Sequence, residues 1–244
     1  MDYPERWKQN VYNVSMSVQG KLRKPPRFSD KSAVIMEFRN DIFLLHVIRV
    51  FLYHLAPRGF AFHIYYGLDN EDLVKRFIEP LGVQIHRMRN HNISPWMYSS
   101  YLMTRDFWEM MPSETIMIFE MDSFIRKNTI EPYLRYDYIG APWNPVVSPW
   151  SKSRNHVGNG GFSIRKKKAM LRCIAARKNT ELLTDDRFFG ETCEDLLYLP
   201  ATDVARSFSV ETWEHPDPVG FHKPWLYLTA EQMERVYQLM LTSS

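Results

Sequence analysis

Short apolar runs alternate with longer segments of helical periodicity through the first half of the chain. Apolar runs bounded by turn residues indicate buried strands. We therefore expect strands at residues 32–38, 61–66, 83–86 and 115–119. Helices are expected between them, at residues 42–55, 70–81 and 94–111. Strands that alternate with helices over short connections are typical of a mostly parallel sheet with helices on both faces.

The second half of the chain is less regular. Strands are expected at residues 136–139 and 162–164, and helices at 166–177, 191–198, 201–207 and 229–241. Residues 1–31 are polar, with Pro25-Pro26 and several basic residues, and we interpret them as an arm or short helix. Residues 32–244 then form a single α/β domain, in which a Rossmann-like nucleotide half precedes a more variable half.

The expected strand at residues 115–119 ends in two carboxylates, Glu120 and Asp122. In open α/β sheets, ligands bind just beyond the carboxyl ends of the strands. Because side chains at i and i+2 of a strand lie on the same side, Glu120 and Asp122 would point into one crevice. Hard oxygen ligands of this kind suit Mg²⁺ or Mn²⁺. On these residues alone, capping of the next turn by Asp122 is an equally good interpretation.

Composition narrows the class of protein. Hydrophobic residues make up 45% of the 244 residues, enough for a substantial core. The net charge is only +3 and the basic residues are scattered, so we expect no nucleic-acid partner. Cys173 and Cys193 form neither a disulfide framework nor a metal-ligand spacing. The N-terminus lacks a signal-peptide layout, and the longest apolar-rich segment, residues 42–55, is too short to span a bilayer. We expect a soluble, cytoplasmic protein, which could also be one module of a longer polypeptide.

Three further segments carry side chains capable of chemistry. Residues 158–161 (Gly-Asn-Gly-Gly) allow a close approach of backbone to a ligand, although a glycine-rich turn before a strand is the simpler interpretation. Glu194 and Asp195 lie at an expected helix start, where a carboxylate facing a cleft can act as a general base but a solvated face is more usual. His222 is a potential metal ligand and Lys223 can neutralise phosphate, although a single histidine more often has no such role.

In combination, these features resemble glycosyltransferases with the GT-A fold. The resemblance spans roughly residues 32–225: an alternating α/β half, a strand ending in a DxD-like motif, a glycine-rich strand, an acidic helix and a late His-Lys. The phrases YIGAPW, VGNGGFSIR and GFHKPW are similar to those of a largely uncharacterised family taken to be glycosyltransferases. The Lys-Pro-Trp ending is also similar to glycogenin-like enzymes. The acidic motif departs from the usual DxD because Glu120 stands in the first position.

The resemblance implies a hexosyl- or pentosyltransferase that moves a sugar from a nucleotide-diphosphate donor to a hydroxyl of a glycan or other acceptor. A UDP-sugar is the default expectation among such donors. The nucleotide base would lie near Glu37 and Arg39, and Asp122 and His222 would hold Mn²⁺ or Mg²⁺. Further donor contacts are expected from Arg105, Asp106, Glu120, Asn159, Gly160 and Lys223.

The resemblance also implies a single displacement with inversion. Asp195 would deprotonate the acceptor hydroxyl, with Glu194 as the alternative base. Two other functions remain open from the sequence. One is a metal-dependent phosphoesterase that uses Glu120, Asp122 and His222, which would need more metal carboxylates at neighbouring strand ends than the sequence shows. The other is an inactive module that binds sugar nucleotides.

Overall fold

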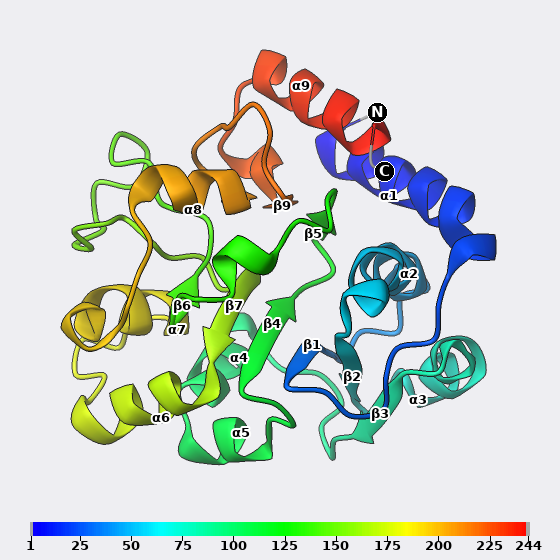
Figure 1. Ribbon diagram of the computed structural model, residues 1–244, viewed down its shortest axis with the longest axis horizontal. Helices are drawn as coiled ribbons and strands as arrows, with labels where there is room; N and C mark the ends of the chain where they lie inside the picture. The colour runs from blue at the N-terminus through cyan, green and yellow to red at the C-terminus, as the bar shows by residue number, and fades with distance from the viewer. Residues whose placement is uncertain (1, 243–244) are drawn as a thin grey trace.

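A six-stranded sheet runs through the centre of the computed structural model, which describes residues 2–242 (Figure 1). The strand order is β3-β2-β1-β4-β7-β6, and β7 runs antiparallel between β4 and β6 while β1 to β4 are parallel. The strands are β1 Lys31–Glu37, β2 Ala61–Tyr66, β3 Gln84–Arg87, β4 Thr115–Phe119, β6 Tyr138–Ile139 and β7 Phe162–Lys166. The expected α/β class with a mostly parallel central sheet is therefore confirmed.

Helices cover both faces of this sheet because its strands are apolar on both sides. In β1, Ala33 and Ile35 belong to the core cluster formed with α1, α2 and α9. Val34 and Met36 belong to the opposite cluster, formed with α4, α5 and α6. The helices are α1 Tyr3–Val18, α2 Phe43–Leu55, α3 Glu71–Leu73, α4 Pro95–Leu102, α5 Arg105–Met110, α6 Lys167–Ala176, α7 Asp185–Arg187, α8 Thr202–Phe208 and α9 Ala230–Leu241.

The helix expected at residues 94–111 is in fact two helices, α4 and α5. Thr104 starts the second one, since its side-chain oxygen accepts a hydrogen bond from the backbone nitrogen of Phe107 at 3.2 Å. The break separates the two helices in space: residues of α4 line a pocket beyond the carboxyl ends of β1 and β4, whereas no residue of α5 does. In the second half, the helix expected at 191–198 is a π-helical turn, Phe188–Thr192, followed by a 3₁₀ turn, Glu194–Leu196.

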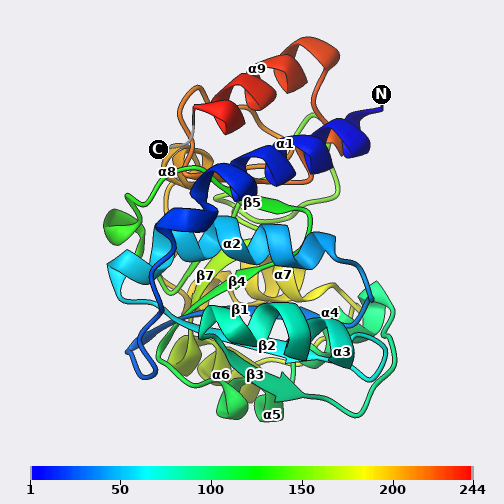
Figure 2. The same ribbon diagram turned by 90° about the vertical axis from the view of Figure 1, so that its right-hand side faces the viewer.

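The residues that we interpreted as an arm or short helix form the 16-residue helix α1. Trp7 is 1% exposed, and its ring centroid lies 4.9 Å from that of Trp225. Arg6 pairs with Glu234 of α9 at 2.6 Å, and Figure 2 shows the two helices side by side. Helix α1 therefore contributes to the same core as the sheet. Residues 1, 243 and 244, included in the expected arm and domain, lie outside the described part of the chain.

A second, three-stranded sheet lies beyond the carboxyl end of β4. Its order is β5-β9-β8, with β5 Ser123–Ile125, β8 Ser209–Val210 and β9 Gly220–His222. Gly220–His222 is the middle strand because its backbone pairs with β5 on one side and with β8 on the other, and Phe221 is fully buried between them. His222 is therefore held by backbone pairing.

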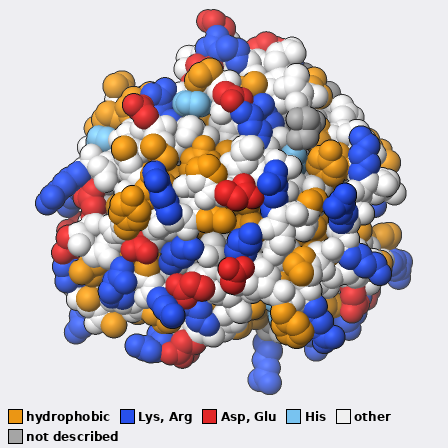
Figure 3. All heavy atoms as spheres, viewed as in Figure 1, with side chains coloured by type: hydrophobic (Ala, Val, Ile, Leu, Met, Phe, Trp, Pro, Cys, Tyr) orange, Lys and Arg blue, Asp and Glu red, His pale blue; other side chains and the backbone are white. Residues whose placement is uncertain are grey.

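The surface carries charges of both signs. On the face shown in Figure 3, basic and acidic side chains are interspersed and neither kind gathers into one large patch. Within residues 2–242, none of the helices combines the length and the hydropathy that crossing a membrane would need.

His54 on α2 predicts an acid-sensitive fold. It is 1% exposed, and neither ring nitrogen has a hydrogen-bond partner within residues 2–242. Burial, with a smaller effect of Arg126, lowers the pKa of His54 to about 4. In the unfolded chain a histidine has a pKa of about 6.5. Between these values the unfolded chain binds a proton that the folded chain does not, so stability should fall as the pH drops from about 6.5 to 4.

The measurement is the free energy of unfolding in urea at several pH values. His54 should contribute a slope of up to about 1.4 kcal/mol per pH unit in this range. His54→Leu should reduce the slope by this contribution. Equal slopes in wild type and His54→Leu would contradict the assignment.

Candidate active site

A pocket of about 500 Å³ opens at the carboxyl edge of the central sheet. Its lining comes from both halves of the chain: the end of β1, the first turns of α4, the turn after β4, the glycine-rich segment before β7, the start of α7 and the ends of β8 and β9. Ligand sites of open α/β sheets lie at this edge.

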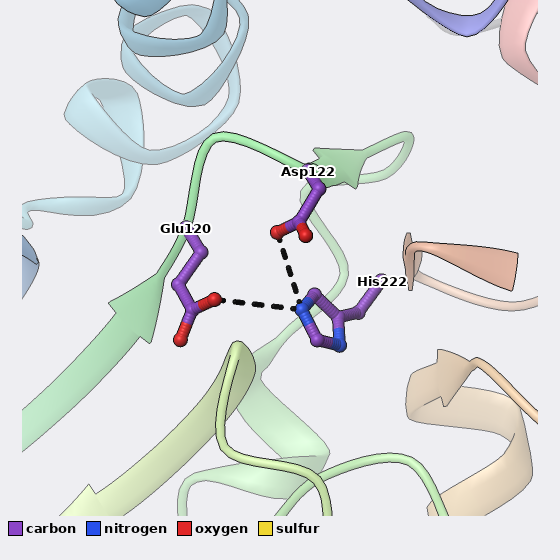
Figure 4. Close-up of side chains that lie close together, drawn as sticks. All are labelled: Glu120, Asp122 and His222. Atoms are coloured by element: carbon purple, nitrogen blue, oxygen red, sulfur yellow. Dashed lines mark ion pairs between the residues drawn. The ribbon is translucent and has the colours of Figure 1, made fainter. Parts of the chain in front are cut away.

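Glu120, Asp122 and His222 converge in this pocket (Figure 4). Asp122 Oδ1 lies 3.2 Å and Glu120 Oε2 lies 3.7 Å from His222 Nε2. Asp122 Oδ1 and His222 Nε2 are buried, and neither has a hydrogen-bond partner in the described chain. Buried polar atoms left in this way cost free energy unless another group joins them. Two ligands of octahedral Mg²⁺, each at about 2.1 Å, lie about 3.0 Å apart, so the pair fits a divalent cation.

The electrostatics of these groups are coupled. Burial opposes protonation of His222, but Asp122, Glu120 and Glu211 outweigh it and raise the pKa of His222 well above its usual range. Burial would raise the pKa of Asp122, but His222 and Lys223 lower it well below its usual range. His222 is therefore protonated here, whereas a histidine that binds a metal ion must be neutral. A cation bound here would take the place of that proton.

Residues 158–161 give the pocket its shape. A Cβ atom on Gly161 would lie 2.2 Å from His222 Nε2, so only glycine leaves room for the imidazole. Asn159 has the left-handed φ of 56°, and its Nδ2 lies 2.7 Å from His222 Nδ1. Lys223 is also left-handed, with φ of 31°. Such conformations are costly for residues other than glycine and are concentrated at functional sites.

Several residues expected at the donor site do line the pocket. Glu37 is buried there, and its Oε1 accepts hydrogen bonds from the backbone nitrogens of Phe38 at 2.9 Å and Arg39 at 2.8 Å. The Arg39 guanidinium pairs with Glu37 Oε2 at 2.6 Å, and this hydrogen bond raises the pKa of Arg39. Glu120, Asn159, Gly160 and Lys223 complete this group.

Arg105 and Asp106 do not reach the pocket. Both are exposed on α5, and Arg105 pairs with Glu109 at 2.8 Å. The helix is interrupted at Thr104, so α5, which carries both residues, lies apart from the residues of α4 that line the pocket. The pocket is lined instead by Tyr98 and Ser99 of α4.

Glu194 and Asp195 also lie outside the pocket, which corrects their interpretation as the general base. Asp195 is 61% exposed and pairs with Arg177 at 2.7 Å. Glu194 accepts hydrogen bonds from the backbone nitrogens of Arg154 and Asn155 at 3.1 and 3.2 Å. The physical reason is the π-helical turn before them, which buries Phe188 and Phe189 and leaves the following 3₁₀ turn at the surface.

Two carboxylates that the sequence reasoning missed, Asp185 and Asp186, begin α7 inside the pocket. Asp185 is held by the fully buried Arg165, whose Nη2 lies 2.7 Å from Oδ2, and by Ser99 Oγ, which donates to Oδ1 at 2.9 Å. Burial and the charge of Asp185 raise the pKa of Asp186 to about 6. The available signal was Thr184, a residue type that starts helices, before two acidic residues and an apolar pair.

Glu211, at the end of β8, is a third missed carboxylate. It is 3% exposed, lines the pocket, and places Oε1 at 3.2 Å from His222 Nδ1. No local pattern marks it, because its position depends on the pairing of β8 with β9.

Sequence comparison places the chain in a family. A profile described as "Protein of unknown function (DUF5672)" matches residues 82–222, more than half of the chain. The chain belongs to this family. The matched region carries Glu120, Asp122, Asn159, Asp186 and His222, and therefore most of the pocket. A search of curated proteins gives no match.

Three solved structures resemble the fold at TM-scores just above 0.5. The galactosyltransferase LgtC, in complex with donor and acceptor sugar analogs, has a TM-score of 0.52 at 11% identity, over 87% of this chain and 96% of its own. The mannosyltransferase PcManGT from Pyrobaculum calidifontis, in complex with GDP-Man and Mn²⁺, has 0.51 at 9%, over 82% and 64%. Mouse xyloside xylosyltransferase 1 has 0.51 at 12%, over 82% and 99%. At these identities the likeness shows the fold alone, and it is the expected GT-A fold.

Gly161→Ala tests whether the His222 ring needs the space that Gly161 leaves. The added methyl group would meet a buried imidazole, so the ring or the backbone must shift, at a cost of about 1–3 kcal/mol in the free energy of unfolding. Gly20→Ala is the control, because a Cβ there meets no atom within 4 Å. The free energy of unfolding and the affinity for Mn²⁺ should both fall in Gly161→Ala only. Equal values in the two variants would show that the pocket has more room than described.

Proposed function

We propose that the protein is a metal-dependent, inverting glycosyltransferase that moves a hexosyl or pentosyl group from a nucleotide-diphosphate sugar to a hydroxyl of a glycan or other acceptor. The observation that carries the proposal is the convergence of Asp122 Oδ1 and His222 Nε2 at the carboxyl edge of a GT-A sheet: they are buried, lie 3.2 Å apart and make no hydrogen bond within the described residues. Two solved structures of similar fold support it, since PcManGT was solved with GDP-Man and Mn²⁺ and LgtC with donor and acceptor sugar analogs. A UDP-sugar is the default donor.

On the donor side, Asp122 and His222 would hold Mn²⁺ or Mg²⁺, with Glu120 beside them. A cation bound there acts as a Lewis acid and stabilises the leaving diphosphate. Burial disfavours the charge of Lys223, but Asp122, Glu120 and Glu211 outweigh it and raise its pKa. Lys223 therefore stays protonated and offers a point charge to the diphosphate.

The rest of the donor would lie along the pocket wall. Asn159 and Gly160 line the part next to the acidic floor and would contact the donor sugar. The Arg39 guanidinium, 60% exposed and oriented by Glu37, would contact the nucleotide at the end of β1. The phrases VGNGGFSIR and GFHKPW supply Asn159 and His222, so proteins that share both phrases would share this site.

For the acceptor side we propose Asp186 as the general base, in place of Asp195. Asp186 lines the pocket but is not one of the three groups that face the cation position. Its pKa of about 6 suits proton transfer near neutral pH, where the group is deprotonated but still basic. Asp186 would take the proton from the acceptor hydroxyl as the oxygen attacks the anomeric carbon, which gives inversion.

Two alternatives have less support. A phosphoesterase with two metal ions needs a second set of carboxylates about 4 Å from the first cation. Within residues 2–242, Glu120, Asp122 and His222 are the one group of three side chains close enough together to hold a metal ion, so the described chain offers no second set. An inactive nucleotide-sugar-binding module would use the same pocket and differs only in turnover.

A panel of nucleotide sugars, offered with and without Mn²⁺, tests the donor and the metal together. Wild type should release nucleoside diphosphate from one donor, with Mn²⁺ required. Asp122→Asn should lose Mn²⁺-linked nucleotide binding in calorimetry but keep the fold of wild type, because the amide fills the same space in the turn between β4 and β5. Thermal stabilisation without turnover would indicate the inactive module, and release of inorganic phosphate would indicate the phosphoesterase.

Asp186→Asn tests the base once a donor is known. It should retain donor binding and lose about 10²–10⁴-fold in kcat, the usual effect of a lost general base. Because the base must be deprotonated, wild-type activity should rise with pH through about 6, and this limb should disappear in the variant. Asp195→Asn, at the exposed position, should keep full activity. A retained anomer in the product, observed by NMR, would contradict the displacement but not the transferase.

A further inference from the structure

The imidazole of His222 lies between two polar environments. Its Nε2 faces Asp122 and Glu120, at 3.2 and 3.7 Å. Its Nδ1 faces Glu211 Oε1 at 3.2 Å and Asn159 Nδ2 at 2.7 Å. Glu211 is buried and extends from β8, so it reaches the ring from the side opposite to the acidic pair.

The two neighbours of Nδ1 require opposite states of that nitrogen. A carboxylate only accepts, so Glu211 needs a proton on Nδ1. An amide nitrogen only donates, so Asn159 Nδ2 needs a lone pair there. The amide is oriented by the backbone nitrogen of Gly161, which donates to Asn159 Oδ1 at 3.2 Å. A neutral imidazole has one proton, so the partner that Nδ1 takes decides which state Nε2 has.

The position of this proton decides whether Nε2, the ring atom that faces Asp122, can bind a cation. If Asn159 donates to Nδ1, a neutral His222 carries its proton on Nε2, pointing at the acidic pair and blocking a cation. If Glu211 accepts from Nδ1, the Nε2 lone pair faces the acidic pair and can bind a cation. Asn159 makes the shorter contact with Nδ1, at 2.7 Å against 3.2 Å for Glu211. A hydrogen bond to an ionised acceptor is, however, roughly twice as strong as a neutral one, which favours Glu211.

We propose that Glu211 is a positioning residue that selects the metal-binding tautomer of His222. The inference rests on the metal site of the proposed function and assigns a role to a carboxylate that would touch neither the donor nor the cation. Carboxylates that accept from the second nitrogen of a metal-bound histidine fix the orientation of the ring and increase its basicity. Loss of such a partner lowers metal affinity by about 10–100-fold.

Glu211→Gln is the informative substitution. The amide has nearly the same shape as the carboxylate, but it can donate to Nδ1 and so favours the proton on Nε2. Titration with Mn²⁺ alone, followed by the electron paramagnetic resonance signal of the free ion, should show a Kd about 10–100-fold weaker than that of wild type. Glu214→Gln is the matched control, because it removes the same charge from a carboxylate that pairs with Arg235 at 2.6 Å. It should bind Mn²⁺ like wild type.

The tautomer itself gives a second readout, which a merely structural role would not change. In wild type with Mg²⁺, ¹⁵N spectra of the histidine rings should show the His222 proton on Nδ1. Glu211→Gln should shift the population toward protonated Nε2. If Glu211→Gln fails to fold, the same two measurements on Glu211→Asp keep the inference testable, because its shorter side chain withdraws the carboxylate from Nδ1.

The outcomes separate the inference from the proposed function. Equal Mn²⁺ affinity in Glu211→Gln and Glu214→Gln would overturn the inference and leave the metal site standing. A proton on Nε2 of wild type in the presence of Mg²⁺ would show that Nε2 is not a ligand and would overturn both. Failure of wild type to bind Mn²⁺ or Mg²⁺ would overturn both. A weaker Kd together with the tautomer shift supports the role of Glu211.

Discussion

The pocket depends on one antiparallel pairing, between β5 and β9. Its register sets Ser123 opposite His222, and the backbone nitrogen of Lys223 donates to the carbonyl oxygen of Asp122 at 3.0 Å. Ser123 also ties this strand to the large sheet, since its hydroxyl donates to the carbonyl oxygen of Gly161 at 2.6 Å. Two acidic residues in a tight turn repel each other. The pairing sets a histidine and a lysine from the far end of the chain beside them, which offsets this repulsion.

Space is the second constraint. Gly161 leaves room for the imidazole, and the left-handed backbone of Asn159 brings its amide to the same ring. Lys223 needs a left-handed conformation as well, in order to leave β9 directly beside Asp122. Each such residue costs about 1–3 kcal/mol and persists only where its surroundings over-determine it. Here the surroundings are the hydrogen-bonded strands of the two sheets, which hold the left-handed Asn159 and Lys223 in place.

The sequence predicts those parts of the fold that local patterns decide. Strands β1, β2 and β4 are buried on both faces, so their apolar runs are unambiguous, and Asp122 follows from the strand-end rule. The break at Thr104 and the π-helical turn before Glu194 are not visible in periodicity, and both displaced candidate residues from the site. Glu211 could not be predicted, because only the pairing of two short strands brings it to His222.

The charges of the pocket divide it into two regions. Glu37 is matched by Arg39 and Asp185 by Arg165, and these pairs hold the side chains in place. On the floor, one imidazole faces Glu120, Asp122 and Glu211, three carboxylates that a divalent cation would balance better than a proton. At the start of α7, burial and the like charge of Asp185 raise the pKa of Asp186 to about 6. In the proposed function, Asp122 and His222 would hold the cation and Asp186 would take the proton, so the two tasks would fall to different residues, as a displacement with inversion requires.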